Sequence, residues 1–212
     1  EYLAAAATKL EEQGRTAVFV GRDDQVIGVL AVADTIKDDA RDVVRQLHAM
    51  GLQVAMITGD NARTANAIAN EVGIDRVLAE VLPEDKVNEV RRLQDEGRLV
   101  AMVGDGVNDA PALVQADLGI AIGTGTDVAI EASDITLMSD RLDGVVRSIQ
   151  LSRQTLRTIH QNLGWAFGYN TAAIPLAALG LLNPVVAGAA MGLSSVSVVT
   201  NSLRLRRFGR DQ

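Results

Sequence analysis

The sequence predicts an α/β domain built on a parallel sheet, followed by a hairpin of two transmembrane helices. Short apolar runs alternate with helical patterns over residues 53–138, an order typical of a parallel sheet covered by helices on both faces. Polar turns follow several of these runs, at the strand ends where open α/β sheets bind ligands. Residues 161–203 contain no Asp, Glu, Lys or Arg, which indicates a segment of a different kind.

The elements before this alternation are two helices and a pair of strands. Residues 2–12 are rich in alanine and helical in character, and Gly14 ends the helix. Residues 16–20 and 26–32 are mostly apolar and flank a polar turn, which predicts two strands. A helix is then expected over residues 37–50, because its apolar residues share one face and a glycine follows it.

The alternating part contains five further predicted strands with helices between them. The strands are expected at residues 53–57, 76–79, 99–103, 118–122 and 135–138. One helix is expected to follow residues 58–61 and to run to residue 71. Two more are expected from Pro83 onward and over residues 107–115. Proline suits a first helical turn because its missing N–H has no partner there anyway. A Gly/Thr loop occupies residues 123–126.

Composition limits the classes of function. The 212 residues carry a net charge of −7, which argues against a nucleic-acid partner because phosphate contacts need clusters of Lys and Arg. The absence of cysteine excludes disulfides and thiolate metal sites within these residues, and it fits a soluble part that faces the cytosol. No signal peptide is indicated and the first residue is Glu1, so we expect the chain to begin partway through a longer protein.

Three polar side chains gather where the predicted strand 99–103 ends. Asp105, Asn108 and Asp109 lie in and after a Gly-Asp-Gly turn that opens a helix. Carboxylates at this edge suit a hard cation such as Mg²⁺, and an amide beside free N–H groups suits phosphate. A capped turn is the alternative, since Asp and Asn favour helix starts for backbone reasons alone. A turn does not need all of these polar groups, so we favour the functional interpretation.

Further polar residues are expected at the same edge of the sheet. Thr58 follows the strand 53–57, and the Gly/Thr loop follows the strand 118–122. Lys86 begins a helix after a short strand; taken alone it fits a solvated helix end, and it gains meaning only beside Thr58 and Asp105. A hydroxyl, a lysine, two carboxylates and an asparagine together describe a phosphoryl-transfer site.

Four motifs, in this order and spacing, resemble those of the P-type ATPases, ion pumps whose phosphorylation domain has a haloacid dehalogenase-like fold. The matching segments are Asp34-Thr35-Ile36-Lys37, Thr58-Gly59-Asp60-Asn61, Pro83-Glu84-Asp85-Lys86 and the run from Gly104 through Asp105, Asn108 and Asp109 to Leu113. The set is far more specific than any single member.

The resemblance implies a role for each matched residue. Asp105 would bind Mg²⁺ and Asp109 would support the metal shell, while Thr58 and Asn108 would hold the phosphoryl group that Lys86 neutralises. Asp60, with Gly59 of the same motif, would lie at the phosphate and nucleotide side of the crevice, where ATP binds.

The sequence departs from the family in one respect. The phosphorylated aspartate of these pumps belongs to an Asp-Lys-Thr-Gly-Thr segment that does not occur here, and the actuator domain and most of the nucleotide domain are missing too. We therefore expect residues 1–30 to end a nucleotide-binding domain, residues 31–150 to form the C-terminal part of the phosphorylation domain, and residues 151–212 to hold the last two transmembrane helices and a cytosolic tail. Alone, this part of a pump is expected to be inactive.

Two segments are long enough to cross a bilayer as helices. Residues 159–182 would span about 36 Å and residues 185–203 about 28 Å at the helical rise per residue. Arginines precede the first segment and follow the second, whereas the connection carries no charge, which places both outer ends in the cytosol. A buried helical hairpin in a soluble protein is the alternative, and the long absence of charge argues against it.

Polar and soft side chains within these segments are candidate metal ligands. Tyr169 and Asn170 lie near the middle of the first segment, and Met191 and Ser195 share a face of the second. A thioether favours Cu(I), and the other three can add oxygen contacts. Packing is the alternative, since methionine usually fills core gaps and small residues let helices approach closely.

The two segments that contain these four residues also resemble the last two helices of the copper-type heavy-metal pumps. Their zinc and cadmium relatives are expected to carry an aspartate on the final helix, and none is present. The thiolates of the family's Cys-Pro-Cys helix are not in this chain.

The sequence therefore predicts the C-terminal part of an ATP-driven Cu(I) exporter, a multi-pass plasma-membrane protein whose soluble domain is cytosolic. Its partners would be the missing N-terminal part of the pump, the lipid bilayer and a cytosolic copper chaperone. Ag(I) has the same ligand preference as Cu(I). The alternatives are a membrane-anchored, Mg²⁺-dependent phosphatase of the haloacid dehalogenase-like type, which needs its own nucleophilic aspartate ahead of Thr58, and a catalytically inert truncated subunit.

Overall fold

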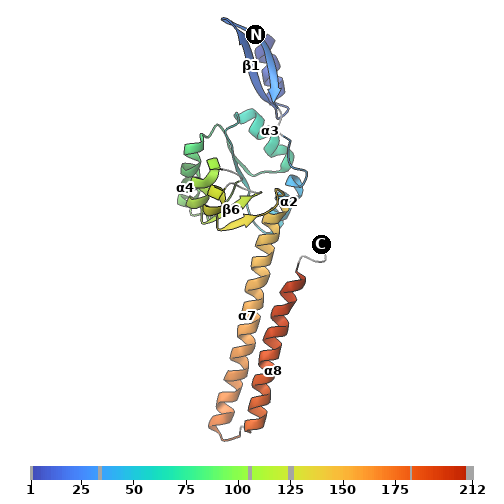
Figure 1. Cartoon of the computed structure of the whole chain (residues 1–212), viewed down its shortest axis with the longest axis vertical. Helices are drawn as coiled ribbons and strands as arrows, with labels where there is room; N and C mark the ends of the chain where they lie inside the picture. The colour runs from blue at the N-terminus through green and yellow to red at the C-terminus, as the bar shows by residue number, and fades with distance from the viewer. Residues whose placement is uncertain (1, 33–34, 105–106, 124–126, 182, 209–212) are drawn as a thin grey trace. The chain divides into compact units, whose positions relative to one another are not determined.

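The computed structural model describes residues 2–32, 35–104, 107–123, 127–181 and 183–208. The chain forms two compact units, Glu1–Val146 and Arg147–Gln212. Figure 1 follows the order of the elements along the chain. Asp34, Asp105 and residues 124–126 of the Gly/Thr loop lie outside the described residues.

The first three elements are those that the sequence predicts. Helix α1 spans Tyr2–Glu11, and strands β1 (Thr16–Arg22) and β2 (Gln25–Val32) pair antiparallel. Both strands run closer to the turn than expected, because a two-residue turn at Asp23 and Asp24 lets Arg22 pair with Gln25. Asp23 adopts a φ of 53°, the left-handed conformation that such tight hairpin turns require.

The alternating strands and helices of the first unit are confirmed. The strands are β3 (Ala55–Ile57), β4 (Arg76–Leu78), β5 (Ala101–Gly104), β6 (Leu118–Ile122) and β7 (Ile135–Leu137). The helices are α2 (Ala40–Ala49), α3 (Ala62–Val72), α4 (Lys86–Asp95), α5 (Ala110–Gln115) and α6 (Asp127–Glu131), with 3₁₀ turns η1 (Pro83–Asp85) and η2 (Val107–Asp109).

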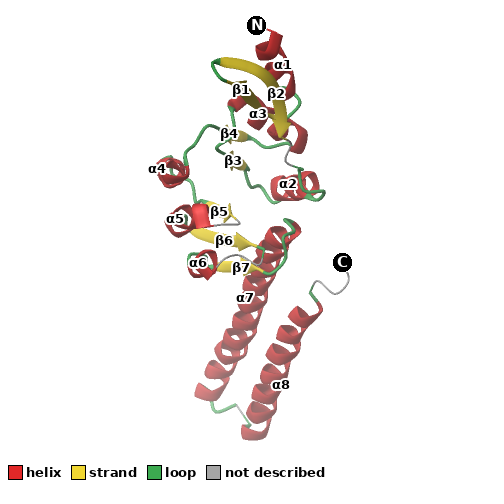
Figure 2. Cartoon of the chain, turned by 45° about the horizontal axis from the view of Figure 1, so that its top comes forward, coloured by secondary structure: helices red, strands yellow, loops and turns green. Residues whose placement is uncertain are grey.

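The strands of this alternation pair in parallel, as predicted, but in two sheets. β3 pairs with β4, and β5, β6 and β7 form a second sheet with β6 at its centre. Figure 2 shows both sheets with the helices beside them. Within the described residues, β3 is hydrogen-bonded along its β4 side and β5 along its β6 side, so no strand links the two sheets.

Several element boundaries differ from the sequence prediction, and one helix was not predicted at all. Helix α2 begins at Ala40, with Asp39 as its N-cap residue, and the Asp39 side chain accepts a hydrogen bond from the Asp143 backbone N–H at 3.1 Å. β5 begins at Ala101, since Leu99 is 91% exposed and takes no part in the sheet. Helix α6 is unexpected, because a helix of five residues has too little periodicity to stand out in a sequence.

The core of the first unit is built around β6. Ile120 and Ala121 of this strand are completely buried, and Leu113 of α5 is nearly so. Burial on both faces explains the continuous apolar run that predicted this strand. A methyl group at Gly119 would come within 2.8 Å of the Leu113 carbonyl oxygen, so this glycine allows α5 to lie close against the sheet.

A repeated carboxylate contact fixes the starts of the parallel strands. Asp75, just before β4, accepts a hydrogen bond from the Val54 N–H at 2.7 Å, and Asp117, just before β6, accepts one from the Val100 N–H at 2.8 Å. The Val54 bond, with help from His48, lowers the pKa of Asp75. The Val100 bond, with Gln94, lowers the pKa of Asp117. Each carboxylate thus stays ionised and ties one strand to its neighbour.

The second unit contains most of one long helix and the whole of another, joined by a short connection. Helix α7 (Asp143–Ala178) and helix α8 (Pro184–Leu203) lie side by side, and the 3₁₀ turn η3 (Arg204–Arg207) follows (Figures 1 and 2). Most of the first predicted apolar segment, residues 159–182, lies in a longer helix. α7 begins earlier, because the charged residues before 159 are also helical, and it ends at Ala178 because Gly180 adopts a φ of 69°.

Hydropathy does not single out a transmembrane span. Across the part of the chain that the structure describes, none of the helices combines the length and the apolar character needed to cross a bilayer.

Candidate functional site

The turn after β3 places Thr58 and Asp60 next to each other. The Thr58 hydroxyl donates a hydrogen bond to Asp60 Oδ2 at 3.0 Å and accepts one from the Asp60 N–H at 3.1 Å. The Thr58 N–H donates to the Leu78 carbonyl at 2.9 Å, which continues the β3–β4 pairing. The Asn61 side chain then caps α3 by accepting from the Arg63 and Thr64 N–H groups. The turn is therefore held in one conformation from both sides.

The second part of the site is an ion pair between helix starts. Lys86 is the first residue of α4 and Asp109 directly precedes α5, and Lys86 Nζ donates to Asp109 Oδ1 at 2.6 Å. The two side chains are only 18% and 12% exposed. Because both side chains have little access to water, the attraction between their charges is strong, and an anion that approached this edge would compete with Asp109 for Lys86.

A glycine makes room for this pair. Gly104 is the last residue of β5, and a Cβ atom there would lie 2.8 Å from Asp109 Cβ and 2.9 Å from Asp109 Oδ2. No side chain fits at this position unless Asp109 moves. From the sequence, Gly104 was predicted only as part of a turn, although its place at a predicted strand end was a usable signal.

The structure brings together some of the predicted residues and not others. Thr58 contacts Asp60, and Lys86 contacts Asp109, but no hydrogen bond or ion pair joins the two groups in the described part of the chain. Asn108 lies in η2 with an exposed side chain. Gly59 belongs to the turn between Thr58 and Asp60, and Asp105 lies outside the described residues. Among the residues that are described, no group of three or more His, Asp or Glu side chains is arranged to hold a metal ion.

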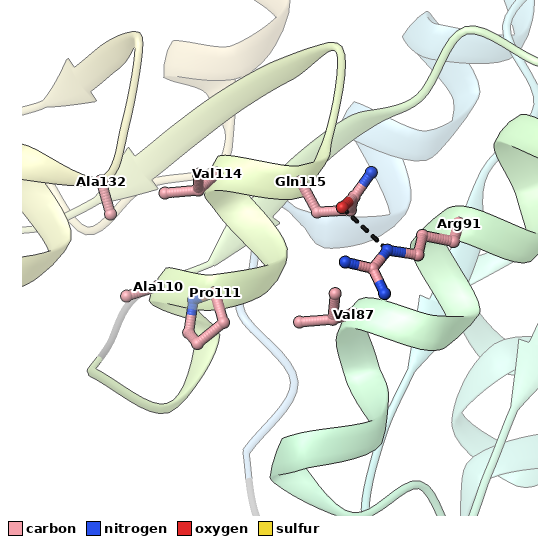
Figure 3. Close-up of a pocket in the computed structure, with 7 residues that line it drawn as sticks. All are labelled: Val87, Arg91, Ala110, Pro111, Val114, Gln115 and Ala132. Carbon is pink, nitrogen blue, oxygen red and sulfur yellow. Dashed lines mark hydrogen bonds between the residues drawn. The ribbon is translucent and has the colours of Figure 1, made fainter.

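A pocket of about 460 Å³ lies beside the ion pair rather than at it. Figure 3 shows the residues that line it, from α4, α5 and the turn just after α6: Val87, Arg91, Ala110, Pro111, Val114, Gln115 and Ala132. Arg91 Nε donates to Gln115 Oε1 at 2.9 Å across one end. None of the predicted site residues lines the pocket, so we do not assign it to the reaction.

The four candidate ligands of the second unit form local contacts. Asn170 donates to the Ala166 carbonyl at 2.8 Å, and Ser195 donates to the Met191 carbonyl at 3.1 Å. The Tyr169 ring lies 6.3 Å from that of Trp165. Met191 is 72% exposed. In the described residues, no hydrogen bond or ring contact joins the α7 pair to the α8 pair.

A polar cluster in the same unit was not predicted from the sequence. It consists of Gln161 and Asn162 on α7 and Asn201 and Ser202 on α8. The signal was present, since each segment has an adjacent pair of uncharged polar residues near its outer end, but their pairing depends on how the two helices align.

These features define an α/β protein with polar side chains at the carboxyl ends of parallel strands, the arrangement of many phosphate-handling enzymes. Comparison with known families makes the class specific. The family model for haloacid dehalogenase-like hydrolases matches residues 1–117, and a second model of the same description matches residues 86–149. The chain belongs to the haloacid dehalogenase-like hydrolase family.

Individual relatives are ion pumps. The whole chain aligns over 211 residues with "Probable copper-exporting P-type ATPase V" of Mycobacterium tuberculosis at 87% identity. The alignment covers 27% of the length of that protein. The chain also aligns over 208 residues with "Copper-exporting P-type ATPase" of Staphylococcus aureus at 58% identity. This alignment covers 98% of the chain and 26% of that protein. The chain thus spans about a quarter of the length of these curated relatives.

Solved structures of a related pump resemble nearly the whole chain. A crystal structure of a zinc-transporting PIB-type ATPase superimposes with a TM-score of 0.81 at 42% identity, over 96% of this chain and 33% of that one. A second crystal structure of a zinc-transporting PIB-type ATPase, in a different state, gives a TM-score of 0.80 at the same identity and coverage.

Proposed function

We propose that this chain is the C-terminal part of a P-type ATPase that exports Cu(I) from the cytosol through an aspartyl-phosphate cycle. The observation that carries the proposal is the Lys86–Asp109 pair at the carboxyl ends of parallel strands, in a chain that is 87% identical to a copper-exporting pump. The domain limits are proposed as residues 1–30, 31–150 and 151–212.

The residues of the first unit divide the work of handling a phosphoryl group. The Thr58 hydroxyl and the Asn108 amide would donate hydrogen bonds to its oxygens, and Lys86 would offset its charge. In the structure the single hydroxyl proton of Thr58 is donated to Asp60, so this proton would turn from Asp60 to the phosphoryl group when that group binds. Asp60 would lie at the side of the crevice from which ATP approaches. Gly59 keeps the turn free of a side chain there.

Carboxylates at this edge fit Mg²⁺, a hard cation that prefers oxygen ligands. Asp109 Oδ1 is engaged by Lys86, while its Oδ2 lies against Gly104, the residue before Asp105. Asp105 would bind the ion directly and Asp109 would support it. When bound, Mg²⁺ supplies positive charge that stabilises the transferring phosphoryl group.

The phosphorylated aspartate would come from the missing N-terminal part of the pump. β3 and β5 each have one edge that is not hydrogen-bonded to another strand of the described chain. We propose that an upstream strand pairs with these edges, unites the two sheets and places its aspartate beside Thr58 and Lys86. A strand with unpaired N–H and C=O groups along one edge readily accepts such a partner.

We further propose that α7 and α8 are the last two membrane helices. Residues 161–203 carry no Asp, Glu, Lys or Arg, and Arg153, Arg157, Arg204 and Arg206 flank them. Polar residues within these helices reduce their hydropathy, and in a bundle such residues face other helices or an ion pathway. Tyr169, Asn170, Met191 and Ser195 would contribute to the Cu(I) site together with thiolates from the missing helix.

Two experiments test this proposal. In the intact pump, Asp105→Asn should abolish the acid-stable phosphoenzyme formed from ATP in the presence of Cu(I), because it removes charge from a Mg²⁺ ligand. Asp95→Asn is the control, since Asp95 is exposed at the end of α4. Wild-type turnover in Asp105→Asn would refute the assignment.

The second experiment tests the membrane topology. A cysteine at Leu181, in the connection between the helices, should react with a membrane-impermeant maleimide on intact cells that express the pump. A cysteine at Phe208, beyond η3, should react only after permeabilisation. The reverse pattern would contradict the proposed orientation, and reaction of both in intact cells would contradict a membrane hairpin.

A further inference from the structure

Three hydrogen bonds join α7 to α8 at one level of the hairpin. The Asn201 amide donates to Asn162 Oδ1 at 2.9 Å and to Gln161 Oε1 at 3.2 Å. The Asn162 amide donates to Ser202 Oγ at 2.9 Å. Each amide therefore bonds across the gap between the helices, and Asn162 both donates and accepts. Asn162 and Asn201 are also half-buried, whereas most side chains of the hairpin are exposed.

These three hydrogen bonds fix which residues of the two helices are opposite each other. Tyr169 lies two helical turns after Asn162, and Ser194 lies two turns before Asn201, so each shares a face with its amide. Because the helices are antiparallel, the Asn162–Asn201 contact brings Tyr169 level with Ser194, at a depth of about 10 Å from the amides.

The same alignment carries the candidate ligands to one side of the hairpin. Asn170 is turned by about 100° from Tyr169, and Ser195 by about 100° from Ser194. In antiparallel helices these rotations lead to the same side, and Met191, one turn before Ser195, lies there too. A slip of one helix by a single turn would move the two sets apart by about 5.4 Å, which is more than a metal site can tolerate.

We propose that Asn162 and Asn201 are positioning residues, which set the register of α7 and α8 so that Asn170, Met191 and Ser195 can serve one Cu(I) ion. The inference rests on the proposed function, because it assigns these three side chains to that function's metal site. Asn162 and Asn201 do not bind the metal themselves. They act through the helix alignment, and Gln161 and Ser202 supply the remaining partners of their amides.

The test uses the intact pump and measures how ATP hydrolysis depends on Cu(I). Asn162→Ala and Asn201→Ala should each raise the Cu(I) concentration for half-maximal activity by roughly 3- to 15-fold, because each removes two of the three hydrogen bonds and such bonds between membrane helices are individually modest. The KM for ATP should not change. The double variant should be worse than either single one but by less than the sum of their effects, because both lose the Asn162–Asn201 bond while each keeps one of the other two.

Rescue separates positioning from a general need for a polar residue or for correct folding. Asn162→Gln keeps the amide, and Gln161 already reaches Asn201 with a side chain of that length, so this variant should return the Cu(I) dependence to within about twofold of wild type. Thr200→Ala is the matched control, because Thr200 is exposed beside Asn201. X-ray absorption of bound Cu(I) should differ from wild type in the alanine variants and match it in Asn162→Gln.

The outcomes distinguish this inference from the proposed function. An unchanged Cu(I) dependence in both alanine variants overturns the positioning role, and so does an equal effect of Thr200→Ala. Met191→Val, measured in parallel, tests the proposed metal site itself. If it leaves Cu(I) binding unchanged, the proposed function fails and the positioning role fails with it. If Met191→Val reduces Cu(I) binding and the alanine variants of Asn162 and Asn201 do not, the proposed function is supported and the positioning role is overturned.

Discussion

Lys86 and Asp109 form an ion pair of 2.6 Å between the first turns of two helices, although they lie 23 positions apart in the sequence. Gly104 at the end of β5 leaves the space that the Asp109 side chain occupies. The position of the Asp109 carboxylate therefore depends on Lys86, which binds it, and on Gly104, which has no side chain to displace it.

Loss of the lysine should affect both stability and reaction. Lys86→Ala leaves the Asp109 carboxylate with little access to water and no cation, which should reduce the free energy of unfolding by about 1–3 kcal/mol. In the intact pump it should also lower the level of phosphoenzyme. Urea unfolding of the chain and phosphorylation of the pump measure the two effects. Lys9→Ala, at an exposed position on α1, should change neither; equal losses in both variants would contradict the prediction.

A methyl group at Gly104 should displace Asp109. Its Cβ would approach Asp109 Cβ to 2.8 Å, so Gly104→Ala must push Asp109 away from Lys86. The expected cost is about 1–3 kcal/mol of unfolding free energy, with loss of phosphoenzyme in the intact pump. Gly28→Ala is the matched control, because nothing lies within 4 Å of a Cβ atom there. A Gly104→Ala protein as stable and active as Gly28→Ala would show that Asp109 can adapt.

Acid should destabilise the first unit through the strand-linking carboxylates. Hydrogen bonds from the Val54 and Val100 N–H groups lower the pKa of Asp75 and of Asp117 in the folded state. A lowered folded pKa gives stability that is complete above the unfolded value, about 3.9 for aspartate, and that disappears as the pH falls through the folded pKa.

Substitution of either aspartate should remove part of this dependence. Asp117→Asn cannot lose a proton, so its unfolding free energy should vary less with pH below about 4 than that of wild type. Urea unfolding between neutral and acidic pH measures the difference. Asp95→Asn should behave like wild type, and an Asp117→Asn curve parallel to wild type over the acid range would rule out this source of the dependence.

The chain by itself should not form an acyl-phosphate. The groups proposed to hold a phosphoryl group are present, but the sequence contains no Asp-Lys-Thr-Gly-Thr segment to accept it. Incubation with radiolabelled ATP and Mg²⁺ should therefore leave the isolated 212 residues unlabelled after acid quenching. Labelling at a stoichiometry near one would identify a nucleophile within the chain and favour the phosphatase alternative.

Replacement of the thioether should affect the metal and not the nucleotide. Met191→Val removes a soft ligand, so the intact pump should bind less Cu(I) per molecule while its affinity for ATP is unchanged. Metal analysis after gel filtration measures the stoichiometry. An unchanged value would assign Met191 to packing.

Most elements of the first unit could be predicted because their signals are local. The apolar run of residues 118–122 gave β6 with its observed limits, and Gly14 and Pro83 marked a helix end and a helix start. The division into two sheets could not be predicted, since strand pairing depends on which edges meet. The five-residue helix α6 and the late start of β5 were also missed, because periodicity is weak over so few residues.

The sequence by itself determined the family and the residue types of the site, because motifs such as Thr58-Gly59-Asp60-Asn61 are contiguous in the chain. Only the tertiary structure decided which of these side chains meet. It paired Lys86 with Asp109 and Asn162 with Asn201, whereas the contact of Thr58 with Asp60 lies within a single motif. The physical reason is that hydrogen bonds and ion pairs act over a few ångströms, and only the packing of helices and strands brings distant residues within that range.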